Sequence, residues 1–285
     1  MLRAVHAHAG QPAAPHDLIS AWRPDWFVVT GLVLVCLLYL QGRSRSTRPP
    51  RNAPFAAGIA AVAVALLSPL ETASGSLASA HMVQHVLLVL VGAPLLALGR
   101  ALPTVGMGLP IRLRRAWWRL MHGTGLDAGR RRWLQAPLLA LAVYAIVFWF
   151  WHAAVPYQAA LESDFVHAAE HLSFLATALL FWQAVLIPDP AGRGLRVLAV
   201  FGAAMQGTLL SALLTFAPRP WYGGYVDSAP LWGLDPLTDQ QLAGLLMWVP
   251  GGLVYTAAAL AILTGWLRRL ETDPTRSVGA SLQSR

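Results

Sequence analysis

Long apolar runs separated by short polar segments are the dominant pattern of this chain. Most of the runs approach the ~20 residues that a helix needs to cross a bilayer core of about 30 Å. The pattern predicts an all-α fold, a polytopic bundle of about seven transmembrane helices in one membrane domain. The predicted spans cover residues 26–40, 53–70, 80–98, 134–155, 165–187, 195–217 and 240–266. Residues 1–25 and 267–285 are the tails outside this bundle.

The composition agrees with a membrane protein. Hydrophobic residues make up 56% of the 285 residues and charged residues only 12%, whereas about 45–50% apolar residues and about 25% charged residues are usual in soluble domains. The chain has a single cysteine, Cys36, so neither a disulfide framework nor a cysteine metal site is expected. Any metal chemistry has to use histidine, methionine or carboxylate groups.

The positive charges indicate how the bundle is oriented. All 21 basic residues are arginine, and 18 of them lie in four alternate segments, 41–52, 99–133, 188–196 and the stretch after 267. This asymmetry follows the positive-inside rule, which predicts a cytoplasmic C-terminal tail and an N-terminal tail outside the membrane. Because the arginines lie in membrane-flanking loops, they favour contact with the bilayer and its anionic lipid headgroups, with no nucleic-acid partner.

Five of the nine histidines fall at one predicted depth. Two open the third apolar run, one lies near the end of the fourth run and two open the fifth run. The third and fifth spans enter from the outer side and the fourth returns to it, so their imidazoles are expected to meet near the outer surface. Polar side chains inside a membrane are costly and therefore indicate function. These candidate metal ligands are His81, His85, His152, His167 and His171.

The spacing of the histidines supports a shared ligand. Residues four apart lie on one face of a helix, and this spacing occurs at His81 and His85 and again at His167 and His171. Glu170 lies beside the second pair and is expected to orient a histidine tautomer. Asp239 suits either a helix N-cap or a site role, while the two methionines among the neighbours suit packing. The possible supporting residues are Met82, Gln84, Glu170, Asp239, Gln240, Gln241 and Met247.

Residues 167–171 also match H-x-x-E-H, a zinc protease signature. Such an enzyme needs a third ligand, usually a downstream carboxylate, but the only acid between His171 and Asp227 is Asp189. Asp189 is expected on the cytoplasmic side, which disfavours a zinc hydrolase, and no catalytic residue is predicted. A histidine and methionine set without cysteine favours copper, while paired histidines across a bundle also suit bis-axial haem. The spacing alone does not separate copper from haem.

Several aromatic residues near the expected outer surface suit the membrane interface. Tryptophan and tyrosine are enriched where lipid headgroups meet water, because one part of each ring system is apolar and another is polar. The sequence therefore predicts an interfacial belt at this level. Its members are Trp149, Trp151, Trp221, Tyr222 and Tyr225.

Four segments, 79–99, 148–161, 166–182 and 238–255, together resemble the CtaG-like family of caa3-type cytochrome c oxidase assembly factors. The resemblance implies a multi-pass protein of the bacterial plasma membrane, linked to oxidase assembly and copper supply, with oxidase subunits as partners. It also places the five histidines in characteristic elements of the family. The leading hypothesis is a non-enzymatic factor that binds copper at the outer face. A haem protein, a zinc hydrolase and a scaffold without metal remain the alternatives.

Overall fold

The computed structural model describes residues 15–16, 22, 25–46, 51–122, 137–186 and 193–271. Most of the two tails and the segments 123–136 and 187–192 lie outside these ranges. The described part is helical and contains no strand. Its α-helices are α1 (Trp26–Arg43), α2 (Asn52–Leu67), α3 (Pro69–Ser74), α4 (Ala78–Val86), α5 (Ala93–Leu98), α6 (Ala101–Gly108), α7 (Ile111–His122), α8 (Pro137–His152), α9 (Ala154–Glu162), α10 (Asp164–Leu186), α11 (Arg193–Thr215) and α12 (Pro236–Glu271).

Each of the seven predicted apolar runs contains a helix. Five helical stretches are long and apolar enough to cross a membrane, namely α1, the continuous stretch Ala78–Leu98, α10, α11 and α12. The pair α8 and α9 gives a sixth if the two count as one span. Helix α2 has 16 residues, short of the ~20 that a perpendicular span needs. The protein is therefore a multi-pass helical bundle, and the number seven stays a prediction.

The helix within the predicted span 134–155 ends before the apolar run does. Helix α8 stops at His152, and the following residues form α9 after a turn of 70°. Ala153 has an extended backbone at this turn, and Pro156 sits in the first turn of α9, where a missing N–H costs no helical hydrogen bond. The segment 156–164, expected as a loop, is thus mostly helix, and His152 lies at a bend.

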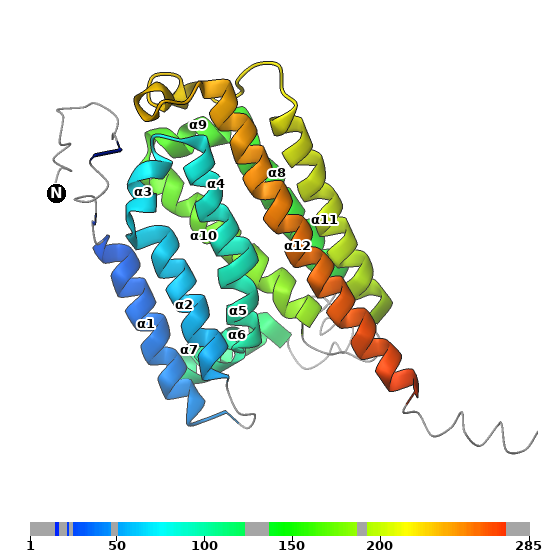
Figure 1. Cartoon of the computed structure of the whole chain (residues 1–285). Helices are drawn as coiled ribbons and strands as arrows, with labels where there is room; N and C mark the ends of the chain where they lie inside the picture. Colours follow the sequence, from blue (N-terminus) through cyan, green and yellow to red (C-terminus); the bar gives the residue numbers. More distant parts are fainter. Residues whose placement is uncertain are drawn as a thin grey trace, which may run out of the picture.

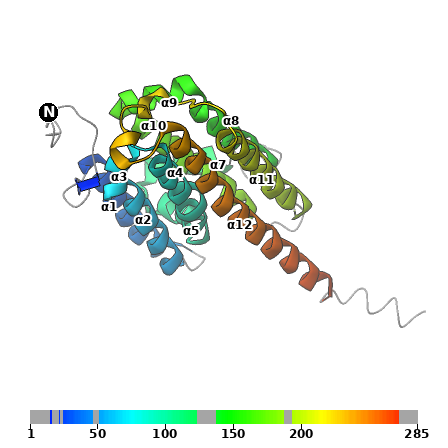
Figure 2. The same ribbon diagram turned by 45° about the horizontal axis from the view of Figure 1, so that its top comes forward.

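The helices form one bundle with two distinct ends (Figure 1). Helices α1 and α2 lie side by side, the stretch from α4 to α5 packs between α2, α10 and α12, and α11 packs along α12. One end carries α3, α9 and the loop between α11 and α12, while α6 and α7 lie at the other end. The view in Figure 2 shows the same arrangement from nearer the first end. We call these the histidine end and the arginine end, after the residues described below.

Glycine allows α1 to approach α6 closely. A Cβ atom on Gly42 would lie 2.8 Å from the backbone nitrogen of Gly108, which is too near for any side chain. Small residues at helix contacts are a common packing device in membranes because they let backbones approach. Tyr39 adds to the interface by donating a hydrogen bond to the carbonyl of Gly99 over 3.0 Å. Although 26–40 is the shortest apolar run, it forms an 18-residue helix.

A π-helical turn, η2 (Leu87–Gly92), joins α4 to α5. In this register the N–H of Ala93 bonds to the carbonyl of Leu88, and the carbonyl of Val89 would require the N–H of Pro94, which proline lacks. The indole N–H of Trp182 fills this place, donating to the Val89 carbonyl over 2.8 Å. The turn therefore leaves this backbone oxygen satisfied, directly below the histidine pair of α4.

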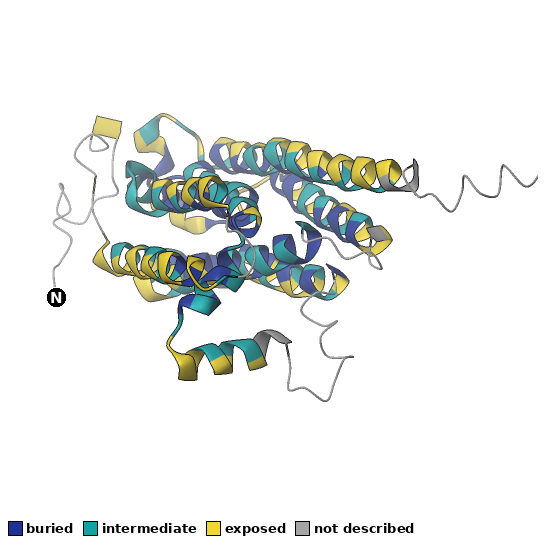
Figure 3. Ribbon diagram, turned by 90° about the horizontal axis from the view of Figure 1, so that it is seen from below, coloured by how far each residue is buried: buried dark blue, intermediate teal, exposed yellow. Residues whose placement is uncertain are grey.

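Apolar side chains cover the outside of the bundle. Figure 3 shows exposed residues along the outward faces of the helices, with buried ones between them. Phe27, Ile146 and Leu253 are at least 69% exposed. Extended apolar surface of this kind is rare on soluble monomers and is expected where helices face lipid, since their backbone groups are already bonded internally.

Candidate metal centre

The five predicted histidines come together at the histidine end. Helix α4 supplies His81 and His85, α10 supplies His167 and His171, and α8 supplies His152. The ring centroid of His81 lies 5.3 Å from that of His167 and 5.9 Å from that of His171. His85 lies 5.4 Å from His171 and 5.9 Å from His152. We call this group the histidine centre; a role for its rings as metal ligands stays a prediction.

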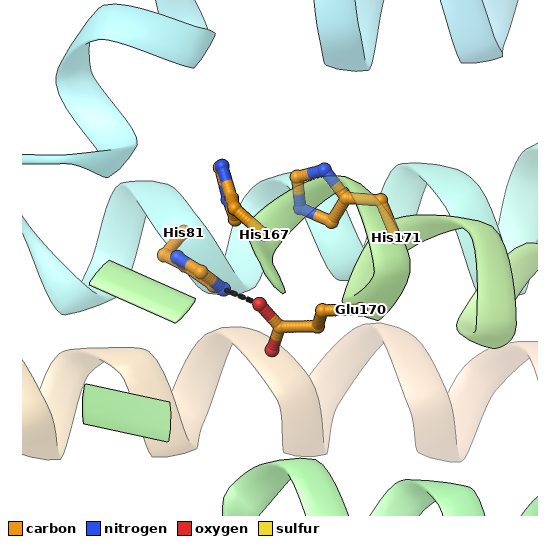
Figure 4. A group of neighbouring side chains, drawn as sticks. All are labelled: His81, His167, Glu170 and His171. Carbon is orange, nitrogen blue, oxygen red and sulfur yellow. Dashed lines mark ion pairs between the residues drawn. The ribbon is translucent and has the colours of Figure 1, made fainter. Parts of the chain in front are cut away.

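Four residues form the tightest part of the centre, shown in Figure 4. One ligand atom from each of His81, His167, Glu170 and His171 lies within 4.8 Å of the others. The carboxylate of Glu170 faces the ring of His81, with 3.6 Å between Oε2 and Nε2. We refer to these four residues as the outer group. The sequence placed Glu170 next to the histidines as a supporting residue, and the structure places it among them.

The polar atoms of the centre are buried without hydrogen-bond partners among the described residues. Nine such atoms belong to it: both ring nitrogens of His81 and of His85, Nε2 of His152, His167 and His171, and both oxygens of Glu170. Glu170 is 0% exposed. Burying a polar group without a partner costs about 1–3 kcal/mol, and a charged group costs more. Such a concentration of unpaired nitrogen and oxygen atoms is expected where a cation completes the site.

The backbone fixes the orientation of His152. Its Nδ1 lies 2.7 Å from the carbonyl oxygen of Phe148. A carbonyl only accepts hydrogen bonds, so Nδ1 must carry the proton and Nε2 presents a lone pair. This arrangement is the one by which proteins commonly hold a metal-binding imidazole.

Glu71 of α3 extends the centre toward the surface and was not among the predicted site residues. Its Oε1 lies 3.6 Å from Nδ1 of His167, and its side chain is 39% exposed. The side-chain amide of Gln84 donates both to the other oxygen of Glu71 and to the carbonyl of Ala65. Burial raises the pKa of Glu71, which the hydrogen bond from Gln84 opposes. In the sequence, only its position at the outer end of the second run hinted at this role.

A tyrosine lid, formed by Tyr157, Tyr222 and Tyr225, covers the histidine end. Tyr157 stacks on Tyr222 at 3.8 Å between ring centroids, and its ring centroid lies 5.2 Å from that of His81. The hydroxyl of Tyr222 donates to the carbonyl of His152. Tyr222 and Tyr225 are 4% and 2% exposed, so the prediction that they lie in an interfacial belt is wrong. The loop between α11 and α12 folds inward, because its hydroxyls find partners there.

The lid tyrosines are neutral donors. Burial, and secondarily the negative charge of Glu170, raise the pKa of Tyr222. Burial also raises the pKa of Tyr225, with Glu170 again contributing in the same direction. The hydroxyl of Tyr225 donates to the carbonyl of Ser74 and lies 3.0 Å from that of Tyr157. Since Tyr225 has a single hydroxyl proton, Tyr157 is the donor in their pair.

Asp239 caps a helix other than its own. Its carboxylate accepts from the backbone N–H groups of Ala78 and Ser79 and from the Ser79 hydroxyl, which satisfies the first turn of α4. The sequence interpretation considered a cap of the seventh span or a site role. The structure instead shows a buried acid of α12 that fixes the helix carrying His81, while Asp235 caps α12.

The other predicted supporting residues are divided between packing and the cavity described next. Gln240 accepts from the backbone N–H of Trp221, and Gln241 donates to the carbonyl of Ala217, so both hold the chain after α11. Met82 is 0% exposed in the apolar core. These three contact the backbone or the core, which explains their positions without a ligand role.

An apolar cavity of about 50 Å³ adjoins the histidine centre. His85 and His152 line it, and helices α8, α10, α11 and α12 supply mostly aromatic and aliphatic walls. Met247, predicted as a supporting residue, lines this cavity too. Its thioether therefore shares a space with the two histidines that lie outside the outer group.

The donor set of the centre suits a transition-metal ion. Imidazole binds copper and zinc well, thioether favours Cu(I), and the absence of thiolate disfavours an iron–sulfur cluster. Two ligands that share one ion at about 2.1 Å lie about 3.4–3.6 Å apart for angles of about 110–120°. The 3.6 Å between His81 and Glu170 matches this spacing and exceeds the usual 2.7–3.2 Å of a hydrogen bond. The residues present therefore fit a metal ion.

Comparison with known proteins gives one family. No curated protein and no solved structure matches the chain. A family model described as cytochrome c oxidase caa3 assembly factor matches residues 19–269, a range that contains α1 to α11 and all but the last two residues of α12. The match agrees with the resemblance seen in the histidine-bearing segments. The chain therefore belongs to the family of caa3 cytochrome c oxidase assembly factors.

Proposed function

We propose that the protein binds copper as cargo at the histidine centre, at the outer face of the bacterial plasma membrane, and supplies it during maturation of cytochrome c oxidase. In this proposal the protein is not an enzyme. Its partners are oxidase subunits that receive the metal or are prepared for it. The family supports a role in oxidase assembly, and the copper step is our addition.

The buried polar atoms of the centre that lack hydrogen-bond partners among the described residues carry this proposal. A buried carboxylate and five imidazoles within 4.2–5.9 Å of their nearest ring neighbours are costly unless a cation joins them. A single proton on Glu170 or on one ring would cancel the charge of the carboxylate but would leave most of these polar atoms without a partner. A metal ion accepts lone pairs from several rings at once, so it offsets the cost that the apoprotein bears.

Copper suits the site better than the two alternatives. A haem held by two axial histidines needs a flat open space between the two imidazole rings. Here other histidine rings occupy the space around each histidine pair; for example, the ring centroids of His81 and His85 lie 4.4 Å apart. A zinc hydrolase needs a glutamate free to act on a bound water. Glu170 lies instead between His81 and His85, at 3.6 Å from each. Both alternatives therefore require rearrangement.

The placement at the outer face rests on the two ends of the bundle. The arginine end contains the last turn of α1, the start of α2 and helix α7. Arg43 ends α1, Arg51 directly precedes α2, and Arg112 and Arg115 lie in α7. The positive-inside rule assigns that end to the cytoplasm. The histidine end then faces outward, and Glu71 with His167 forms its partly exposed edge.

The test is copper binding by the detergent-purified full chain. Wild-type protein loaded with Cu(I) and passed over a desalting column should retain copper, whereas a variant carrying both His81→Leu and His167→Leu should retain clearly less copper per chain. A His122→Leu variant, altered in α7, is the matched control and should bind as the wild type does. Elemental analysis gives the metal-to-protein ratio. Equal ratios in the wild type and the double variant would reject the histidine centre as a copper site.

Maturation needs a separate measurement. Cells that lack the protein should assemble cytochrome c oxidase with deficient copper, and the wild-type chain should restore it while the double variant does not. Restoration by the double variant would show that assembly uses the protein as a scaffold without copper.

A further inference from the structure

The two oxygens of Glu170 face two different histidines. Oε2 lies 3.6 Å from Nε2 of His81, and Oε1 lies 3.6 Å from Nε2 of His85. Neither oxygen has a hydrogen-bond donor among the described residues. If the carboxylate bound one ion through one oxygen, its other oxygen would stay buried without a partner. This would cost the free energy that is typical of buried, unpaired charged groups.

His85 belongs to a different environment from the outer group. It is 5% exposed and lines the apolar cavity together with His152 and Met247. Neither of its ring nitrogens has a hydrogen-bond partner among the described residues, so either can serve as a ligand. The ring of His152 meets it nearly edge-on, with 5.9 Å between centroids. The lone pair of His152 Nε2, defined by the bond of Nδ1 to Phe148, is therefore available in the same neighbourhood.

We propose that His85, His152 and Glu170 form a second metal position, the inner position, with Met247 beside it in the cavity. The proposal rests on the proposed function for the identity of the ion, copper. Glu170 then bridges two ions, with Oε2 on the outer group and Oε1 on the inner position. Metal ions joined in this way commonly lie about 3.5–4 Å apart. The full chain holds two copper ions when loaded.

The spacing supports bridging rather than a simple ion pair. The N···O distance of 3.6 Å at both oxygens matches two ligands of one ion, at about 3.4–3.6 Å, and is too long for a charge-assisted hydrogen bond, at about 2.7–2.9 Å. An imidazolium at both His81 and His85 would place two positive rings 4.4 Å apart in a buried site. Two Cu(I) ions separated by a carboxylate keep their ligands neutral except for Glu170 itself.

The two positions differ in access. The outer group reaches the surface through His167 and Glu71, whose side chains are 19% and 39% exposed. The inner position faces the apolar cavity, where a thioether is the softest donor and favours Cu(I). An ion can thus pass from an edge that contacts water to a drier position without leaving the reach of Glu170.

The number of bound ions tests the inner position. His152→Asn is the informative variant, because the asparagine amide can still donate to the Phe148 carbonyl while the Nε2 ligand is lost. Purified full-length protein is saturated with Cu(I), dialysed against a Cu(I) chelator and analysed for metal. We expect two ions per wild-type chain, one in His152→Asn, one in His167→Leu and none in the variant that carries both changes.

The outcomes separate this inference from the proposed function. One ion in the wild type, lost in His167→Leu and kept in His152→Asn, would overturn the inner position and leave the proposed function standing. No ion in the wild type would overturn both. Met247→Leu, nearly equal in volume, supplies a second check, because X-ray absorption of the wild type should show a Cu–S contribution that this variant loses. An unchanged sulfur signal would remove Met247 from the inner position.

Discussion

The histidine end and the arginine end of the bundle place polar groups in opposite environments. At the histidine end, several imidazole nitrogens and both oxygens of a carboxylate are buried without a hydrogen-bond partner among the described residues. At the arginine end, Arg112, Arg115 and Arg119 of α7 are exposed, so solvent and lipid headgroups can satisfy them. A polar group at an interface costs little, whereas one inside the bundle has to be compensated. The comparison teaches that the unusual chemistry of this molecule is concentrated at one end.

The largest effect is expected from Glu170→Leu, which removes the buried charge of the histidine end with little change in volume. Copper retention should fall at least 100-fold, since a shared ligand is lost. Without copper, the variant should be more stable than the wild type by about 1–4 kcal/mol, because an unpaired buried charge has been replaced by an apolar group. Copper titration and thermal unfolding of the apoprotein in detergent measure both effects.

A less stable Glu170→Leu apoprotein would contradict this view. Breaking a buried ion pair costs about 3–5 kcal/mol, so a loss of that size would mean that Glu170 is paired with protonated histidines when no metal is bound. Added copper should raise the thermal stability of the wild type only, because a ligand stabilises the state that binds it.

Asp239→Ala should have the second largest effect. It removes three hydrogen bonds to a buried carboxylate at the start of α4 and should lower the unfolding free energy by about 3 kcal/mol. Asp235→Ala removes an exposed cap of α12 and should cost about 1 kcal/mol. Thermal unfolding compares the two variants. Equal losses would show that the cap of α4 is no more important than an ordinary surface cap.

Tyr225→Phe tests the lid of the histidine end. It loses the bonds to Ser74 and Tyr157 and should destabilise the protein by about 1–2 kcal/mol. Because the lid covers the centre but supplies no ligand, copper should exchange faster while the number of bound ions stays the same. Transfer of copper to a coloured Cu(I) chelator gives the rate. A changed stoichiometry would place the lid among the ligands.

The smallest effect on copper is expected at the arginine end. Replacing Arg112, Arg115 and Arg119 by glutamine should leave copper binding unchanged. It should weaken the stabilisation by anionic lipid by up to about 1 kcal/mol for each charge near the surface, and high salt should reduce the difference. Thermal unfolding with added phosphatidylglycerol, compared with phosphatidylcholine, measures this. A loss of copper binding would show that the two ends are coupled.

The predicted helices agree with the structure where the apolar pattern alone determines them. They differ where contacts between helices determine the conformation. Residues 165–187 and 195–217 closely match α10 and α11, because long apolar runs need helical bonding in lipid. Residues 134–155 do not, because the bend after His152 depends on Pro156 and on packing at the histidine end. Tyr222 and Tyr225 suited an interfacial belt by residue type, yet their hydroxyls found partners inside the lid.

The sequence by itself determined the helical membrane bundle, the asymmetry of its arginines and the common depth of five histidines, since these follow from hydrophobicity, charge and helical spacing. Only the tertiary structure decided which groups meet. It brought Glu71 to the edge of the centre, showed that Asp239 caps α4 instead of its own helix and placed Glu170 between His81 and His85. The reason is physical: spacing along one helix fixes a face and a depth, whereas contacts between helices depend on how those faces pack.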